Sequence, residues 1–363
     1  DDTLGSQSVA VGYLALLSQN FTSATSAYNT AVGSQAGRLL TTGIQNTLIG
    51  GLAGDAIQAA ADNVAVGFEA LSTETGGQNN VAIGTRALKA QVNSSGNIYN
   101  TAVGSNAGTA MTTGIQNTLV GGLAGDAITS AQYNVCMGVG ALGTTRASSR
   151  NVAIGFSALS SADHTSIVNS HNVAVGMEAG DDITTGVQNT LVGAITETSA
   201  VDVNNEIVIG YAAVGSGTVT ATLGIGATDT SIGLGNTSWS GSSDERLKEN
   251  ITSSTAGLSF INDLRPVTFN WKSIGSIPEE LRGYEEGSDE KYNQNDKTNH
   301  GFIAQEVLDN HPEIKNGHAI WSEKTDGTQA LSPGALVPML VKAIQEQNAL
   351  IEALTTRITT LEG

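Results

Sequence analysis

The chain has 363 residues and 44 glycines, yet only 14% of its residues are charged and 4% are aromatic. One globular body usually carries roughly a quarter of charged residues, so this composition is unusual. The formal net charge of −18 argues against nucleic acid as a partner, because an acidic surface repels phosphate groups. We expect no membrane insertion, since no run of about 18 apolar residues could span a bilayer as a helix. The acidic first residues predict no signal peptide, and the lone Cys136 cannot form an intrachain disulfide.

The composition changes near residue 240. Residues 1–242 carry 15 acidic and 5 basic side chains, whereas residues 243–363 carry 19 acidic and 11 basic side chains in half the length. All five prolines also lie in the second part. We infer that two different physical objects are joined at this point.

The first object is a repeat array with the pattern Asn, apolar, small, aliphatic, Gly, as in residues 63–67. The closing glycine recurs with a step of 17 inside groups and of 20 or 21 between groups, and a larger period runs from Gly33 to Gly104 to Gly176. Regular spacing of this kind is typical of repeat architectures. The closing glycines are Gly12, Gly33, Gly50, Gly67, Gly84, Gly104, Gly121, Gly138, Gly155, Gly176, Gly193 and Gly210.

Each repeat predicts a short strand in which Val or Ile faces one side and Ala faces the other. The glycine allows a turn or a close approach, and the asparagine suits the preceding turn, so we interpret both as structural rather than ligand-binding. A single repeat unit cannot bury its own apolar face, but stacked units can, which predicts a β-solenoid or β-roll. Few large side chains are available for its core, and this favours an oligomer. The longer loops at about 90–98 and 160–170 are better candidates for binding than the strands.

These motifs resemble the head repeats of trimeric autotransporter adhesins, which also occur in phage tail fibres. The resemblance covers about residues 7–215 and implies a parallel β-roll with three chains side by side. The C-terminal membrane anchor of such adhesins is not recognisable here, so we expect a phage setting. A bacterial trimeric surface adhesin without peptidase activity is the alternative.

The junction reads Ser-Asp-Glu-Arg-Leu-Lys-Glu-Asn-Ile over residues 243–251, so that Lys248 follows Ser243 by five positions. From the spacing alone, this pattern fits the capped, acidic first turn of a surface helix. Chemistry is the other interpretation, because a serine beside a lysine is a known nucleophile and base pair.

The same nine residues resemble the start of the intramolecular chaperone domain of phage endosialidases and tail fibres. Residues 301–307, Gly-Phe-Ile-Ala-Gln-Glu-Val, match the second signature of that family. The resemblance implies a domain that drives trimer assembly and then cuts itself off between Ser242 and Ser243. Ser243 would be the nucleophile and Lys248 its base, and burial on assembly would favour the neutral lysine that the reaction needs.

Three further residues have candidate supporting roles. Asp244 and Arg246 also match the motif and would position the reacting groups, unless they are plain charges of a helix start. His300 precedes the second signature and would assist proton transfer, unless it is a structural or surface histidine. We find no metal-ligand spacing, phosphate loop or trusted pair of carboxylates, so we predict no cofactor, no metal and no other enzymatic activity, glycan degradation included.

The end of the chain predicts a helix with Pro338 in its first turn. Apolar residues follow in steps of four and three, a heptad seam interrupted by one Gln, which predicts a coiled coil at about 336–362. The seam alone leans towards a dimer, whereas the family resemblance implies a trimer. Its members are Leu340, Ile344, Gln347, Ile351, Leu354, Ile358 and Leu361. Between junction and helix, a strand at 267–271 and a helix near 304–310 predict an α+β fold.

The predicted fold is therefore mainly β: a trimeric β-roll of short repeats at 1–215, a connector at 216–242, and an α+β chaperone domain at 243–363. The predicted function is that of a tail-fibre-like structural and host-attachment protein, with a single-turnover Ser–Lys autoprotease. Its expected partners are two further copies of itself and a host cell-surface receptor, either glycan or protein. We expect it in the virion after assembly in the host cytoplasm, or on the bacterial surface in the alternative.

Overall fold

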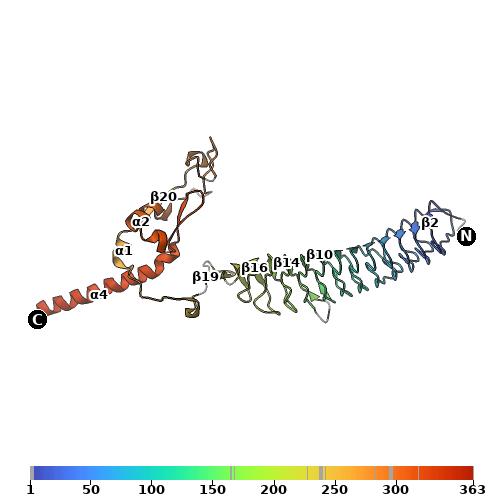
Figure 1. Cartoon of the computed structure of the whole chain (residues 1–363), viewed down its shortest axis with the longest axis horizontal. Helices are drawn as coiled ribbons and strands as arrows, with labels where there is room; N and C mark the ends of the chain where they lie inside the picture. Colours follow the sequence, from blue (N-terminus) through green and yellow to red (C-terminus); the bar gives the residue numbers. More distant parts are fainter. Residues whose placement is uncertain are drawn as a thin grey trace. The chain divides into compact units, whose positions relative to one another are not determined.

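The computed structural model describes residues 4–163, 166, 168–226, 228–236, 240–241, 243–281, 283–293, 297–317 and 319–362. It separates into two compact units, Asp1–Leu247 and Lys248–Gly363. Figure 1 shows a ladder of strands in the first unit and mixed helices and strands in the second. The mainly β fold with a solenoid and an α+β part is confirmed, while the trimer and the coiled coil stay predictions. Among the described residues, no helix is both long and apolar enough to cross a membrane.

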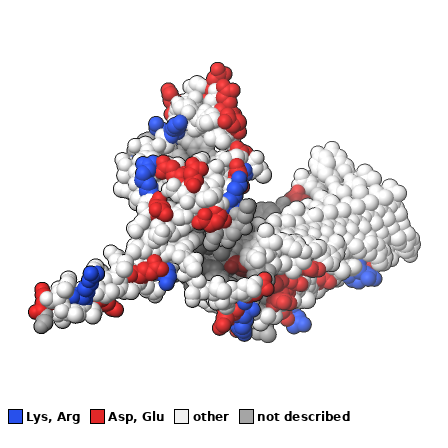
Figure 2. Space-filling view, turned by 60° about the vertical axis from the view of Figure 1, so that its left-hand side comes forward, with Lys and Arg blue, Asp and Glu red and all other residues white. Residues whose placement is uncertain are grey.

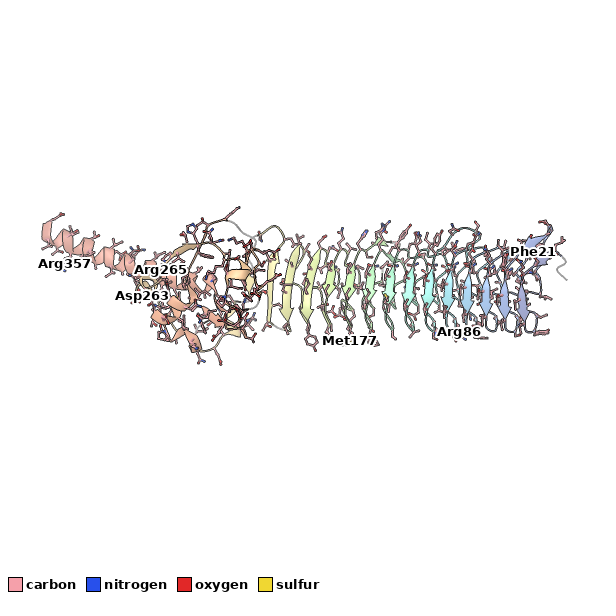
Figure 3. All side chains as sticks on the ribbon, turned by 90° about the horizontal axis from the view of Figure 1, so that it is seen from above. Phe21, Arg86, Met177, Asp263, Arg265 and Arg357 are labelled. Atoms are coloured by element: carbon pink, nitrogen blue, oxygen red, sulfur yellow. The ribbon has the colours of Figure 1, made fainter. Side chains whose placement is uncertain are left out.

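The first unit is built on one sheet of 15 strands, of which β2 to β17 run parallel and β18 and β19 antiparallel. Two short parallel pairs of strands, β1 with β3 and β11 with β13, lie outside this sheet in the longer repeats. Figure 3 shows the strands side by side along the solenoid. The strands of this unit are β1 (Gly5–Ser6), β2 (Val9–Val11), β3 (Thr25–Ser26), β4 (Thr30–Val32), β5 (Thr47–Ile49), β6 (Val64–Val66), β7 (Val81–Ile83), β8 (Thr101–Val103), β9 (Thr118–Val120), β10 (Val135–Met137), β11 (Ser148–Ser149), β12 (Val152–Ile154), β13 (Val168–Asn169), β14 (Val173–Val175), β15 (Thr190–Val192), β16 (Glu206–Tyr211), β17 (Thr220–Ile225), β18 (Thr228–Gly233) and β19 (Ser240–Gly241).

Each parallel strand up to β16, together with its turns, makes one rung, and the rungs stack in register. Ala65 in the middle of β6 pairs with Leu48 on one side and Ala82 on the other, and all three are fully buried. The flanking Val64 and Val66 face away from this core and are half-buried. The period-2 alternation predicted from the sequence thus separates a thin inner core from an outer apolar face.

The asparagine of each repeat lies inside the solenoid and joins successive rungs. The backbone N–H of Asn63 donates to Oδ1 of Asn46 at 3.2 Å, and its side-chain amide donates to the carbonyl oxygen of Gly77 at 3.0 Å. The same pattern recurs from Asn29 onward, and Glu206 ends it by donating its backbone N–H to Asn189. Buried amides need such partners, so the ladder explains why asparagine recurs at this place.

The closing glycine is required by both conformation and space. Gly67 has a φ of +139°, which side chains rarely adopt, and a Cβ there would overlap the carbonyl oxygen of Gly84 in the next rung. No other residue type fits this backbone, which accounts for the regular recurrence of these glycines.

The second unit is a small α+β fold. Its core gathers Phe260, Val307, Ile314, Ile320, Trp321 and Leu336. The predicted helix at 304–310 is found as α2, and the predicted strand ends at Phe269 rather than at residue 271. The elements that follow β19 are η1 (Glu245–Leu247), which closes the first unit, then α1 (Leu258–Asn262), β20 (Val267–Phe269), η2 (Ile274–Ser276), β21 (Asn299–Gly301), α2 (Ala304–Asn310), α3 (Ile314–Gly317), β22 (Trp321–Glu323), β23 (Gln329–Leu331), η3 (Pro333–Ala335) and α4 (Leu336–Glu362).

Candidate active site

The junction forms one short turn. η1 follows Ser243 and Asp244, and the backbone N–H of Leu247 donates to the carbonyl oxygen of Asp244 at 3.2 Å. The Asp244 carboxylate accepts the backbone N–H of Arg246 at 2.9 Å, so Asp244 caps this turn. The helix start expected from the spacing is thus a single 3₁₀ turn with an aspartate cap.

Asp244 and Arg246 also form a two-pronged ion pair. Arg246 Nε lies 3.0 Å from Oδ1, and Nη2 lies 2.6 Å from Oδ2 of the carboxylate. The hydrogen bond to Asp244 raises the pKa of the Arg246 guanidinium above its usual value. This pair lies between the candidate nucleophile Ser243 and the candidate base Lys248, and both of its side chains are exposed, so its positioning role stays a prediction.

The candidate nucleophile and base are exposed in the single chain. Ser243 and Lys248 both face solvent, as do all residues between them. Leu247 and Ile251 expose 71% and 61% of their surface, which is high for large apolar side chains. The burial that would hold a lysine neutral is therefore not supplied here within one chain. Ser242, the other residue of the predicted scissile bond, lies outside the described residues.

His300 belongs to β21 and faces Thr268 across an antiparallel pair with β20. It contributes to the wall of an open, mainly apolar groove of about 770 Å³, beside Trp271, Phe302 and Leu331. The structure thus places His300 in the second unit on a groove wall, and its part in proton transfer stays a prediction.

The second signature, residues 301–307, contributes to the packing of the second unit. Gly301 ends β21, Phe302 packs on the core of the unit, and Val307 on α2 is buried. Glu306 receives two hydrogen bonds from Arg265, one of them from Nε at 2.9 Å, and this contact lowers the pKa of the Glu306 carboxyl. The motif therefore joins β21 to α2 and ties α2 to the segment that follows α1.

Two acidic residues outside the motifs have specific partners that the sequence did not single out. Glu346 of α4 accepts the backbone N–H of Leu258 at 2.8 Å and so caps α1, a contact 88 residues apart. Glu197 lies near Asp181 and Asp182, and its burial, followed by its hydrogen bond to Asp181 and the charges of both neighbours, raises its pKa to about 9. Within the described part of the chain, no group of three His, Cys, Asp or Glu side chains could hold a metal ion.

Most of the predicted heptad seam of α4 faces solvent. Leu336, Met339 and Ala343 pack against the rest of the unit, on a neighbouring face of the helix. The exposed seam residues are Leu340, Ile344, Ile351, Leu354, Ile358 and Leu361, with exposed fractions from 44% to 80%. A long helix with an exposed apolar stripe is typical of helices that pack against a further element, and the coiled coil stays a prediction.

Comparison with known families adds one finding about this part of the chain. Residues 243–314 match the family described as chaperone of endosialidase. The match begins at Ser243 and includes Lys248, Asp244, Arg246 and His300, while the solenoid and α4 lie outside it. This family is associated with trimer assembly, so a solenoid followed by such a segment fits a tail-fibre-like protein. Neither the curated proteins nor the solved structures contain a match.

Proposed function

We propose that this chain is a homotrimeric, tail-fibre-like structural and host-attachment protein whose second unit aligns three copies and is then released by autoproteolysis. The observation that carries the proposal is the family match that starts at Ser243, directly after the solenoid and its last strands. We place the protein in the virion, assembled beforehand in the host cytoplasm. A host receptor, glycan or protein, would contact the solenoid, and the exposed residues 94–97 in the loop of a longer repeat are candidates for that contact.

The proposed reaction uses two residues of the junction. The Ser243 hydroxyl attacks the carbonyl carbon of Ser242 while the Lys248 amine takes the hydroxyl proton. The C–N bond breaks, the nitrogen of Ser243 takes up that proton, and an ester joins the Ser242 carbonyl to Ser243 Oγ. Water then attacks the ester with Lys248 as base, which leaves a carboxylate on Ser242 and restores the serine hydroxyl.

The junction is exposed in one chain, which supports a cleavage reaction that takes place only after the copies have assembled. Leu247 and Ile251 flank Lys248 with exposed apolar side chains, and contact with other copies would bury all three together. Burial disfavours the charged form of a lysine and so supplies the base. Cleavage would then report that three chains have come together.

Two surfaces support self-association. The exposed seam of α4 offers about three heptads to other helices, and the outer face of the solenoid carries half-buried Val, Ile and Thr along its length. Charged residues are absent from the outward positions of the described strands β2 to β15. Figure 2 shows a broad uncharged surface on the solenoid, with Lys, Arg, Asp and Glu gathered along one edge. Uncharged apolar faces of this extent are typical of surfaces covered in an assembly.

The cleavage is tested by the intact mass of freshly purified protein. We expect wild type to give two fragments, the smaller one beginning at Ser243, and Ser243→Ala and Lys248→Met to stay full length. Ser253→Ala and Lys324→Met change the same residue types elsewhere in the second unit and should cleave normally. A full-length wild-type chain in a sample that light scattering shows to be trimeric would rule out autoproteolysis.

The trimer is tested separately through α4. In a Ser243→Ala background, Ile351→Asp with Leu354→Asp puts two charges on the exposed seam without touching the core of the unit. We expect loss of the trimer by light scattering, because buried carboxylates without partners are costly. Gln345→Asp with Thr356→Asp adds the same charge on the opposite side of the helix and should leave the trimer intact. A seam variant that remains fully trimeric would exclude α4 from the assembly.

A further inference from the structure

The outer face of the solenoid consists of three columns of side chains. Counted from the closing glycine, they occupy the third position before it, the position before it and the position after it, as Val64, Val66 and Phe68 do around Gly67. The third column lies where the strands end, and Figure 3 shows Met177, one of its members, at that edge. Phe68 and Met177 are 47% and 46% exposed, so this column is open to a partner.

The first two of these columns repeat along the solenoid with a period of four rungs, and the third column repeats in part. The rung with Thr101, Val103 and Ser105 presents the same three residue types as the rung with Thr30, Val32 and Ser34, which lies four rungs earlier in the stack.

The next rungs continue the copy: Thr118, Val120 and Gly122 replace Thr47, Ile49 and Gly51. In a third copy of the period, Thr190, Val192 and Ala194 are again close equivalents. In the first two columns, a partner chain displaced by four rungs would therefore meet nearly the same side chains as one in register.

The displaced arrangement keeps part of the contact between two copies. Strands lie about 4.8 Å apart, so four rungs amount to an offset of about 19 Å. Of the twelve rungs from β2 to β16, eight would still face one another in the displaced arrangement. The third column departs from the period in five of these eight rungs, so the displaced state loses packing there and at the unpaired ends. The mismatched pairs are Tyr13 with Thr85, Phe68 with Val139, Thr85 with Phe156, Ser105 with Met177 and Val139 with Tyr211.

We propose that the outer face is a copy-to-copy interface with a second, metastable register four rungs out of phase, which α4 excludes. The partner is a second copy of this chain, and the inference rests on the self-association proposed above. Displaced copies leave four apolar rungs uncovered at each end, and such open ends recruit further copies instead of closing a trimer. The seam of α4 runs from Leu340 to Leu361, about 32 Å, so two copies of α4 displaced by about 19 Å along their own axes would lose more than half of it. Copies whose helices join in register first then favour the matched rungs, because both units belong to one continuous chain.

The test places cysteines on the two equivalent rungs. Ser34 and Ser105 occupy the same position after the closing glycine, and Cys136 is replaced by Ala, which occupies its position in other rungs. Two differently tagged full-length chains, both carrying Ser243→Ala, are co-expressed and treated with a bismaleimide whose reach is well below about 19 Å. Ser34→Cys in both chains reports the matched register, and Ser34→Cys in one with Ser105→Cys in the other reports the four-rung displacement.

With wild-type α4 we expect the matched product alone. With Ile351→Asp and Leu354→Asp we expect the displaced product to rise at least tenfold, together with species larger than a trimer at higher concentration. Gln345→Asp with Thr356→Asp should not raise it. A pair three rungs apart, Ser34→Cys with Thr85→Cys, should stay unlinked throughout.

The outcomes separate the two proposals. Without a matched product in the wild-type background, the copy-to-copy use of this face is wrong. If the matched product forms but the seam variant yields no displaced product, or no more than the three-rung pair, the four-rung register is wrong. A seam variant that does not associate at all would show that α4 is needed for association itself and would also overturn the register role.

Discussion

The two units of this chain hold their folds in opposite ways. In the solenoid, successive rungs repeat similar contacts, and the core runs without a break from Leu16 to Ala213. In the second unit, a few side chains around Phe260 and Trp321 form a small core, and most of the 27-residue helix α4 projects with its seam exposed. A repeat array depends on its neighbouring rungs, whereas a unit with a small core and an exposed seam depends on what it meets.

Substitutions in the two units are therefore expected to have different effects. Changes inside a rung should act on folding of the single chain, because the affected groups are buried and partnered by the next rung. Changes on the exposed seam of α4 should act on assembly and leave the fold of the single chain nearly as it was. The four predictions below address the contacts inside each unit, from the largest expected effect to the smallest.

The largest effect is expected at a closing glycine. Gly67→Val forces a branched side chain into a φ of +139° and onto the carbonyl oxygen of Gly84. We expect the free energy of unfolding to fall by more than about 3 kcal/mol in urea titrations. Gly122→Ala is the control, because its Cβ would come no closer than 3.9 Å to a neighbour and Ala194 occupies the same position in another rung. Equal effects of the two changes would contradict the close stacking of the glycine column.

The asparagine ladder should come next. Asn117 donates its side-chain amide to the carbonyl oxygen of Ala131 at 2.9 Å and accepts the backbone N–H of Asn134 at 3.1 Å. Asn117→Ala leaves both groups buried without a partner, so we expect a loss of about 3 kcal/mol by the same titration. Ser105→Ala, on the outer face, should change the value by less than about 0.5 kcal/mol. A neutral Asn117→Ala would mean that the ladder contributes little to stability.

A smaller effect should follow pH through Glu197. Its pKa in the folded chain is raised to about 9, from an ordinary value of 4.5, so the folded state favours the protonated carboxyl. The stability that this group contributes is complete below about 4.5 and is lost as pH rises towards and through about 9. We expect the melting temperature of wild type to fall over this window relative to Glu197→Gln, which keeps a neutral side chain. Parallel curves for the two proteins would contradict a raised pKa.

The smallest effect is expected at Glu346. The backbone N–H of Leu258, and then Lys342, lower the pKa of this exposed carboxyl. A lowered pKa stabilises the fold above the ordinary value of 4.5, and this contribution is lost as pH falls through the folded pKa below it. Glu346→Gln should therefore lower the melting temperature slightly at neutral pH and match wild type in acid. Glu352→Gln, an exposed glutamate on the same helix, should show no such difference.

Much of the fold could be predicted from periodicity. The regular spacing of the glycines and the alternating side chains before each of them predict stacked rungs, because these features are local in sequence. The helix α4 could be predicted for the same reason, from steps of four and three. In the candidate active site, Ser243 and Lys248 could be named only through a family motif, since a serine and a lysine five positions apart also fit the start of a surface helix.

Other features depend on which groups the fold brings together. That Asp244 accepts the N–H of Arg246, and so caps the turn, depends on the local backbone path. The contact of Glu197 with Asp181 arises because successive rungs place these two positions next to each other.

The cap that Glu346 provides for α1 joins positions 88 residues apart, which no local pattern reports. Local repetition thus specified the rungs and helices of this protein, because their hydrogen bonds and periodic burial are short-range. Folding in three dimensions settled which carboxylates share a site and which face of α4 is left open, because both depend on the partners that distant segments supply.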